Sequence, residues 1–118
     1  MSRFLTERLA ALGHAWRGIA DLVRHHPHGR VHALATLAVL LLALWLEVSS
    51  TDWALLLLAC ALVWTAEAFN TALEYLADRV STEHHPLTGK AKDMAAGAVL
   101  LASLGALGVG VAVLAPYL

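Results

Sequence analysis

The chain of 118 residues is long enough for one domain, and 59% of its residues are hydrophobic while only 14% carry a formal charge. That charged fraction is about half of the fraction in ordinary soluble domains, and the mean hydropathy is +0.67, so the composition excludes a soluble domain and predicts a membrane protein. The net charge of −1 says little about partners, and we expect no nucleic-acid partner. The single cysteine, Cys60, excludes an internal disulfide bond.

Residues 2–24 are predicted to form an amphipathic helix. Apolar side chains recur there at spacings of three and four, and the arginines lie away from that stripe. Because the chain offers little soluble material to pack against, we expect this helix to lie in the membrane interface rather than on a soluble core. The apolar stripe consists of Leu5, Leu9, Leu12, Trp16, Ile19 and Val23.

Three apolar segments follow, at about 31–48, 53–80 and 91–115. Each is long enough to cross a bilayer as a helix, at about 1.5 Å per residue. A short polar turn at 47–52 joins the first two segments. The sequence therefore predicts an all-α membrane protein, with one interfacial helix and three transmembrane helices in a single domain over residues 1–118.

Two loops are predicted where proline and glycine interrupt the helical pattern. The first is 25–32, which contains four histidines, and the second is 81–89. Imidazole is a common metal ligand, but the histidine spacing in 25–32 fits no standard zinc pattern and no thiolate lies nearby. We therefore predict a solvated, histidine-rich loop at the membrane surface.

The basic residues indicate the orientation in the membrane. All eight lysines and arginines, and all seven histidines, lie before the first span or around the connection between the second and third. Since basic residues concentrate on the cytoplasmic side of membrane proteins, we expect the N-terminus to be cytoplasmic and the C-terminus to be outside. The stretch 67–93 would then face the cytosol, where ATP is available.

The second span carries a polar stripe. Glu67, Asn70, Glu74 and Asp78 follow one another at spacings of three, four and four, which places them on one face of a helix. Ionisable groups at the edge of a bilayer are costly, so their presence indicates a functional site. The alternative is a polar cluster that only holds helices together.

The chemistry of this stretch suits transfer of an anionic group to a membrane component. Glu67 lies deepest and is poorly solvated, which suits a general base. Glu74 lies about 10 Å further along the axis and suits a carboxylate that holds Mg²⁺ on nucleotide phosphates. Lys90 and Lys92 can neutralise phosphate oxygens, and Asp93 can bind ribose, a lysine or metal-bound water.

The standard nucleotide motifs are absent. Gly89-Lys90-Ala91 resembles the end of a P-loop, but His84 stands where that motif needs glycine and Ala91 where it needs serine or threonine. Phosphate binding would therefore depend on charges and metal rather than on a backbone cradle. A contrasting interpretation is a non-catalytic small membrane protein that carries metal ions or protons.

Two segments resemble the prokaryotic diacylglycerol kinase family, which includes the undecaprenol kinases. The matching pattern is Glu67-x-x-Asn70-Thr71-Ala72-x-Glu74-x-x-x-Asp78, then His85-x-Leu87-x-x-Lys90-Ala91-Lys92-Asp93-x-Ala95-Ala96, and Ala15-Trp16-Arg17-Gly18-Ile19 looks like the family's N-terminal signature. The resemblance implies a small lipid kinase of the bacterial cytoplasmic membrane that uses Mg-ATP to phosphorylate a lipid hydroxyl. It also implies a homotrimer with active sites at the subunit contacts.

The resemblance assigns roles to individual residues. Glu67 matches the proposed catalytic base and Glu74 a metal-binding carboxylate. His26 stands where the family usually has a second metal-binding Glu. Either His26 serves, which would shift the preference toward Mn²⁺ or Zn²⁺, or Asp21 substitutes, or the metal site is weakened. The positions that match the nucleotide site are His14, Asn70, Glu74, His84, His85, Lys92 and Asp93.

The lipid substrate is expected to be diacylglycerol, which would be converted to phosphatidic acid. The segment 88–92 looks like the diacylglycerol-type members of the family. The segments 85–87 and 95–99 look more like the undecaprenol-type members, so undecaprenol, converted to undecaprenyl phosphate, is the alternative.

Overall fold

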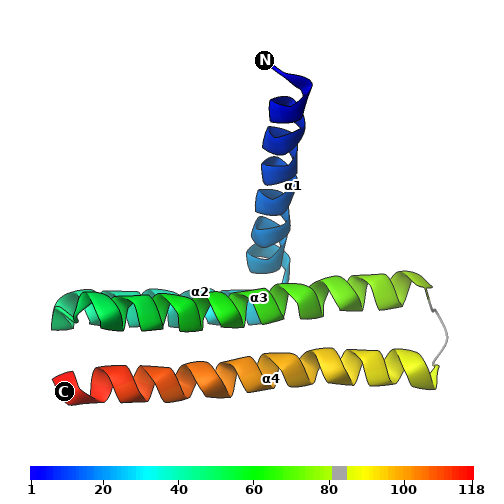
Figure 1. Ribbon diagram of the computed structural model, residues 1–118. Coiled ribbons are helices and arrows are strands. Elements are labelled where there is room, and N and C mark those ends of the chain that lie inside the picture. The colour runs from blue at the N-terminus through cyan, green and yellow to red at the C-terminus, as the bar shows by residue number, and fades with distance from the viewer. Residues whose placement is uncertain (81–84) are drawn as a thin grey trace.

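The computed structural model describes residues 1–80 and 85–118. Figure 1 shows three long helices that lie alongside one another and a further helix, at the N-terminus, that stands across them. The described elements are α1 (Arg3–His25), α2 (Pro27–Leu46), α3 (Ser50–Val80), α4 (Pro86–Leu114) and the short 3-10 helix η1 (Ala115–Tyr117).

Three of these helices are long and apolar enough to cross a membrane: α2, α3, and α4 together with η1. Their outward-facing leucines remain exposed in the single chain, as lipid-facing side chains of a membrane protein do. The all-α architecture with three apolar helices confirms the predicted class of membrane protein. Examples of these exposed leucines are Leu34, Leu44, Leu58, Leu101 and Leu107.

The predicted histidine-rich loop over 25–32 is wrong, because only His26 lies between α1 and α2. Proline is well suited to the first turn of a helix, where its missing N–H is not needed, and α2 begins at Pro27. Gly29 is helical and buried, since its lack of a side chain lets α1 approach closely. A Cβ atom at Gly29 would lie 2.0 Å from the carbonyl oxygen of Leu22.

The C-terminal end of α1 is capped by the chain that follows it. The guanidinium of Arg30 donates to the carbonyl oxygen of Arg24 at 2.6 Å and to that of Val23 at 3.4 Å. These carbonyls belong to the last turn of a helix, where no intrahelical donor is left for them. Arg30 and Gly29 together therefore hold the corner at which the chain turns from α1 into α2.

The second predicted loop is also too long, because α4 begins at Pro86. The ring Nδ1 of His85 accepts a hydrogen bond from the backbone N–H of Leu87 at 3.1 Å and caps the helix. Gly89 lies inside the first turns of α4 and donates its backbone N–H to the carbonyl oxygen of His85. A proline and a glycine that punctuate the sequence thus start a helix here rather than interrupt one.

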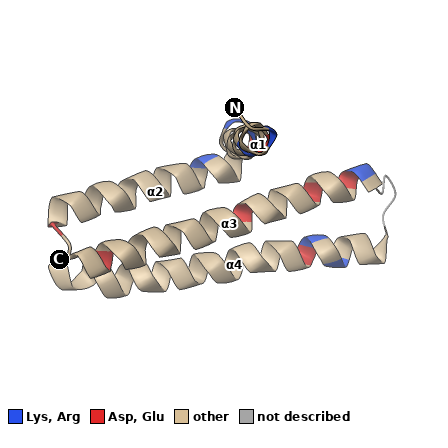
Figure 2. Cartoon of the chain, turned by 45° about the horizontal axis from the view of Figure 1, so that its top comes forward, with Lys and Arg blue, Asp and Glu red and all other residues tan. Residues whose placement is uncertain are grey.

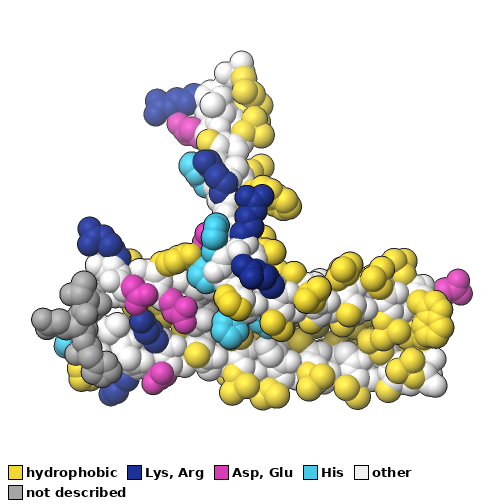
Figure 3. Space-filling view, turned by 180° about the vertical axis from the view of Figure 1, so that it is seen from behind, with side chains coloured by type: hydrophobic (Ala, Val, Ile, Leu, Met, Phe, Trp, Pro, Cys, Tyr) yellow, Lys and Arg dark blue, Asp and Glu magenta, His cyan; other side chains and the backbone are white. Residues whose placement is uncertain are grey.

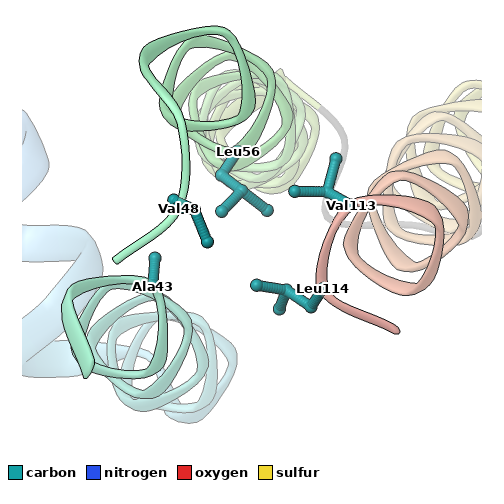
Figure 4. Packing of buried hydrophobic residues seen from close by; sticks show 5 residues of the cluster. All are labelled: Ala43, Val48, Leu56, Val113 and Leu114. Atoms are coloured by element: carbon teal, nitrogen blue, oxygen red, sulfur yellow. The ribbon is translucent and has the colours of Figure 1, made fainter. Parts of the chain in front are cut away.

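The opposite end of the bundle is closed by an apolar cluster and one tyrosine. Figure 4 shows the buried cluster of Ala43, Val48, Leu56, Val113 and Leu114, which joins α2, α3 and α4. The hydroxyl of Tyr117 donates to the carboxylate of Asp52 at 2.5 Å and accepts the backbone N–H of Ser49 at 3.1 Å. The C-terminus is thereby tied to the turn between α2 and α3.

This short turn determines which residues of α2 and α3 face each other. His32 lies 14 positions before the last residue of α2, Leu46, and Glu67 lies 17 positions after the first residue of α3, Ser50, so antiparallel packing brings them to within about one turn of the same height. Beyond Glu67, α3 continues for 13 residues, or about 20 Å, and the end of α1 lies against this part of α3, at Tyr75. The bundle therefore has an apolar part as long as α2 and a projecting part made by α3 and α4 (Figure 1).

The corner between α1 and α2 gives a first prediction. Gly29→Ala should destabilise the protein by roughly 1–3 kcal/mol, because the added methyl group collides with the backbone of Leu22. Thermal unfolding in detergent micelles measures this as a lowered midpoint. Gly105→Ala is the matched control, since nothing lies within 4 Å of that position and alanine favours the helix there. An unchanged or raised midpoint for Gly29→Ala would contradict the predicted clash.

Candidate active site

Glu67 is the one acidic residue among the buried residues of the described chain. It is 3% exposed and lies on the face of α3 that also buries Val63 and Thr71 one turn to either side. Its Oε2 atom lies 3.3 Å from Nε2 of His32, whose side chain is 20% exposed. A buried carboxylate needs such a partner, because removing an unpaired charge from water costs several kcal/mol.

An apolar cavity of about 240 Å³ extends from His32 into the bundle between α2, α3 and α4. About one turn before Glu67 in α3, the indole N–H of Trp64 donates to the hydroxyl of Thr36 at 2.9 Å. This bond satisfies two polar groups inside the apolar part of the bundle, as an apolar surrounding requires. The cavity is lined by His32, Ala35, Val39, Cys60, Ser103 and Ala106, among others.

Asn70 carries a buried oxygen that lacks a partner. Among the described residues and atoms, its Oδ1 has no hydrogen bond. Buried amide oxygens are nearly always paired, so an orphaned one indicates a missing donor or cation. Amide oxygens also belong to the hard ligands that Mg²⁺ takes, and the carboxylate of Glu74 follows one turn further along the same helix.

The projecting part of the bundle holds a cluster of opposite charges. The ammonium of Lys92 in α4 lies 2.7 Å from Oδ1 of Asp78 in α3, and Glu74 adds a further attraction to the same ammonium. Asp78 thus pairs across the two helices rather than with its neighbour Arg79. Figure 2 shows acidic and basic residues at the same end of α3 and α4, and Asp93, which follows Lys92 in α4, is exposed.

A second cluster ties α1 to α3 at the corner. The hydroxyl of Tyr75 donates to Oδ2 of Asp21 at 2.7 Å and lies 2.6 Å from Nε2 of His26. Because the hydroxyl proton goes to Asp21, the ring nitrogen of His26 is the donor to the Tyr75 oxygen. His25 also contacts Asp21, with its Nδ1 at 2.8 Å from Oδ1. Figure 3 shows histidines gathered where α1 meets the bundle.

The acid in this cluster is held in its charged form. The hydrogen bond from Tyr75 keeps the pKa of Asp21 below its ordinary value of 3.8, with smaller contributions from the His25 and His26 rings. A folded-state pKa below the unfolded one means that the contact stabilises the fold at neutral pH. That stabilisation is lost only as the pH falls below about 4.

The contacts of His26 bear on its expected role as a metal ligand. Its Nε2 is engaged by Tyr75, so a metal ion could reach the imidazole only through Nδ1 or by displacing the hydroxyl. Within the described residues, no three His, Cys, Asp or Glu side chains gather closely enough to hold a metal ion. The oxygen donors Glu74 and Asn70 fit Mg²⁺ better than this nitrogen does.

Within the described residues, the other histidines with expected nucleotide roles contact groups close to them in the sequence. His14 is exposed on α1, where its Nδ1 lies 3.0 Å from the guanidinium of Arg17. His85 caps α4 through its ring nitrogen. His84, for which a nucleotide contact was also expected, falls outside the described residues.

Two residues of the site went unnoticed in the sequence. His32 was grouped with the histidine-rich loop, although it lies 15 positions from the 47–49 turn and Glu67 lies 18, which places the two within about one turn of the same height. Tyr75 had no signal of its own, since its partners are Asp21 of α1 and His26 at the corner, and the direction of α1 is set only by that corner. The site thus draws on all four long helices.

Comparison with known proteins identifies relatives that match most of the chain. A family model described as prokaryotic diacylglycerol kinase matches residues 13–114. The diacylglycerol kinase of Escherichia coli strain K12 is 35% identical over 97 residues, which cover 82% of this chain and 80% of that protein. The undecaprenol kinase of Bacillus subtilis strain 168 is 35% identical over 105 residues, which cover 89% and 85%. The diacylglycerol kinase of a Synechocystis strain is 38% identical over 111 residues, which cover 93% of this chain and 63% of that protein.

The Tyr75 cluster gives a second prediction. Tyr75→Phe removes the hydroxyl that joins Asp21 to His26, so α1 should detach more often from the bundle. Hydrogen exchange of the backbone amides in the last turns of α1 should become severalfold faster. Tyr117→Phe is the matched control, because its hydroxyl bridges groups at the opposite end and its loss should leave α1 unaffected. Equal protection of α1 in wild type and Tyr75→Phe would refute the link.

Proposed function

The chain belongs to the prokaryotic diacylglycerol kinase family and is a lipid kinase, and from this premise we propose that it phosphorylates diacylglycerol with ATP to give phosphatidic acid. The observation that carries the proposed mechanism is Glu67, a buried carboxylate about two turns before Tyr75, the residue of α3 to which the end of α1 is tied. Undecaprenol is the second candidate substrate, because a relative named undecaprenol kinase is as similar in identity as one named diacylglycerol kinase.

Glu67 is the proposed general base. It takes the proton from the lipid hydroxyl as the hydroxyl oxygen bonds to the γ-phosphorus of ATP, and the bond from that phosphorus to the ADP oxygen breaks. Catalysis of such a transfer rests mostly on positioning and on neutralisation of phosphate charge. The burial of Glu67 at the inner end of the polar stripe supports this role, because a lipid hydroxyl can reach that depth without leaving the bilayer.

The proposed nucleotide side lies on the projecting part of α3 and α4. Lys92 is proposed to bind phosphate oxygens and Asp93 the ribose or a metal-bound water, while Asn70 and Glu74 supply oxygen ligands for Mg²⁺. The orphaned Oδ1 of Asn70 supports this assignment. A bound Mg²⁺ would neutralise charge on the phosphates. His14, His84 and His85 remain proposed nucleotide contacts, and His26 a proposed metal contact, on the family resemblance.

The proposed location is the bacterial cytoplasmic membrane, with α1 in the interface and the projecting part in the cytosol. Support comes from the crosswise direction of α1 and from the basic residues, which Figure 2 shows only on α1, at the start of α2 and at one end of α3 and α4. Basic residues favour the cytoplasmic side. Accessibility of single cysteines placed at 4 and 118 to a membrane-impermeant reagent in spheroplasts tests this, and labelling at 4 alone would refute it.

We also propose a homotrimer with shared active sites. The exposed apolar faces of α2, α3 and α4 can pack against further copies, and the unpaired Oδ1 of Asn70 can receive a donor from a neighbouring copy. Native mass spectrometry of the detergent-solubilised protein should then record a mass of three chains. A monomer that phosphorylates lipid at full rate would exclude this assembly.

The base assignment gives a third prediction. Glu67→Gln should lower the rate of lipid phosphorylation by at least about a hundredfold, because glutamine cannot accept the proton. The protein should remain folded, since glutamine can still contact His32. Phosphate transfer from labelled ATP to lipid in mixed micelles measures the rate. Glu47→Gln, at the far turn, is the matched control and should keep the rate of the unmodified protein. Near-normal activity of Glu67→Gln would contradict the assignment of Glu67 as the general base.

The substrate proposal gives a fourth prediction. With equal micellar concentrations of diacylglycerol and undecaprenol, kcat/KM should be higher for diacylglycerol. The measurement uses the purified full chain, labelled ATP and separation of the two lipid phosphates. A preference for undecaprenol would replace diacylglycerol as the proposed substrate, and the protein would still be a lipid kinase. If neither lipid is phosphorylated, both proposed acceptors are wrong.

A further inference from the structure

We propose that His32 is a positioning residue for the general base. Its Nε2 atom lies 3.3 Å from Oε2 of Glu67 and restrains that oxygen, so that Oε1 is left to accept the proton of the lipid hydroxyl. This inference rests on the proposed function of Glu67. Apart from His14 and His26, the site residues expected from the sequence lie on α3, on α4 or in the connection between them. His32 adds a residue from α2 to this site.

The position of His32 follows from the packing of the helices. The turn between α2 and α3 places His32 and Glu67 within about one turn of the same height, and the contact of 3.3 Å joins Nε2 to Oε2 across the two helices. Both side chains are largely removed from solvent. In such surroundings a hydrogen-bond donor beside a carboxylate acts more strongly than it would in water.

Orientation is what the contact contributes to catalysis. A glutamate side chain has three rotatable bonds, and its carboxylate would otherwise rotate between several orientations. When one oxygen is held by a donor on a neighbouring helix, the other keeps a defined direction relative to the substrate. Misplacement of a reacting group by about 1 Å can cost as much as a hundredfold in rate.

The cavity beside His32 supports this role. The same imidazole lines the apolar cavity between α2, α3 and α4 and contacts the carboxylate of Glu67, so one side chain connects the cavity with the proposed base. By contrast, His28 lies one turn earlier on the same helix and is exposed.

The test compares two amides of different length at position 32. Glutamine places its amide nitrogen at about the reach of the imidazole Nε2, whereas asparagine ends nearer the backbone. His32→Asn should lower kcat between about tenfold and a hundredfold. KM for ATP and for the lipid should stay within about threefold, because neither substrate is bound by His32 itself. His32→Gln should recover most of the lost kcat. Steady-state assays of the full chain in mixed micelles provide both constants.

A double variant separates positioning from a general effect on the fold. If His32 acts only through Glu67, then adding His32→Asn to Glu67→Gln should not lower the residual rate by more than about twofold. A structural defect would lower it by the full factor seen in the single variant. His28→Asn is the matched control for the substitution and should keep the rate of the unmodified protein.

The outcomes distinguish the positioning role of His32 from the proposed role of Glu67 as general base, on which it rests. Full activity of Glu67→Gln would remove the proposed base itself. If Glu67→Gln is inactive, three results overturn the positioning role alone: full activity of His32→Asn, equal losses for the asparagine and glutamine variants, or a full additional loss in the double variant.

Discussion

A carboxylate buried in an apolar bundle is the constraint on which the rest of this structure depends. Glu67 lies on the inner face of α3, where water cannot solvate it, and it faces the imidazole of His32. Without a partner, a buried ionised group would cost more than a small helical protein can offset. The pairing in turn requires that α2 and α3 pack antiparallel in one register, which the short turn at their far end imposes. The apolar cluster and Tyr117 at that end hold the turn in place.

The corner between α1 and α2 decides where this carboxylate lies relative to the membrane. Gly29 lets the two helices approach, Arg30 caps the end of α1, and Tyr75 ties that end to α3. As a result α1 leaves the bundle crosswise near Tyr75, about two turns past Glu67, while α3 and α4 continue past it. In the proposed kinase mechanism, this arrangement keeps the lipid hydroxyl on one side of Glu67 and the charged nucleotide on the other. In this mechanism α3 contributes residues both to the apolar surroundings of the lipid and to the charged surroundings of the nucleotide.

The errors in the sequence predictions have a common cause. Pro27, Gly29, Pro86 and Gly89 were interpreted as helix breakers, yet both prolines occupy the first turn of a helix and both glycines lie within one. Proline excludes only the continuation of a preceding helix, so by itself it does not distinguish a loop from the start of a new helix. At Gly29 the deciding factor is the carbonyl group of Leu22, which approaches from a different helix. A local pattern contains no information about such an approach.

The sequence by itself determined the class of the protein, its three apolar helices and the polar stripe on the second of them, because composition and periodicity are local properties that the apolar surroundings enforce. It also indicated the lipid kinase family, through a motif in which residue types and spacing both match. Only the tertiary structure decided what the stripe faces: His32 opposite Glu67, Lys92 opposite Asp78, and the Tyr75 cluster around His26. These pairs join residues on different helices, and their contacts depend on how helices are turned and packed against one another, which no single segment of sequence encodes.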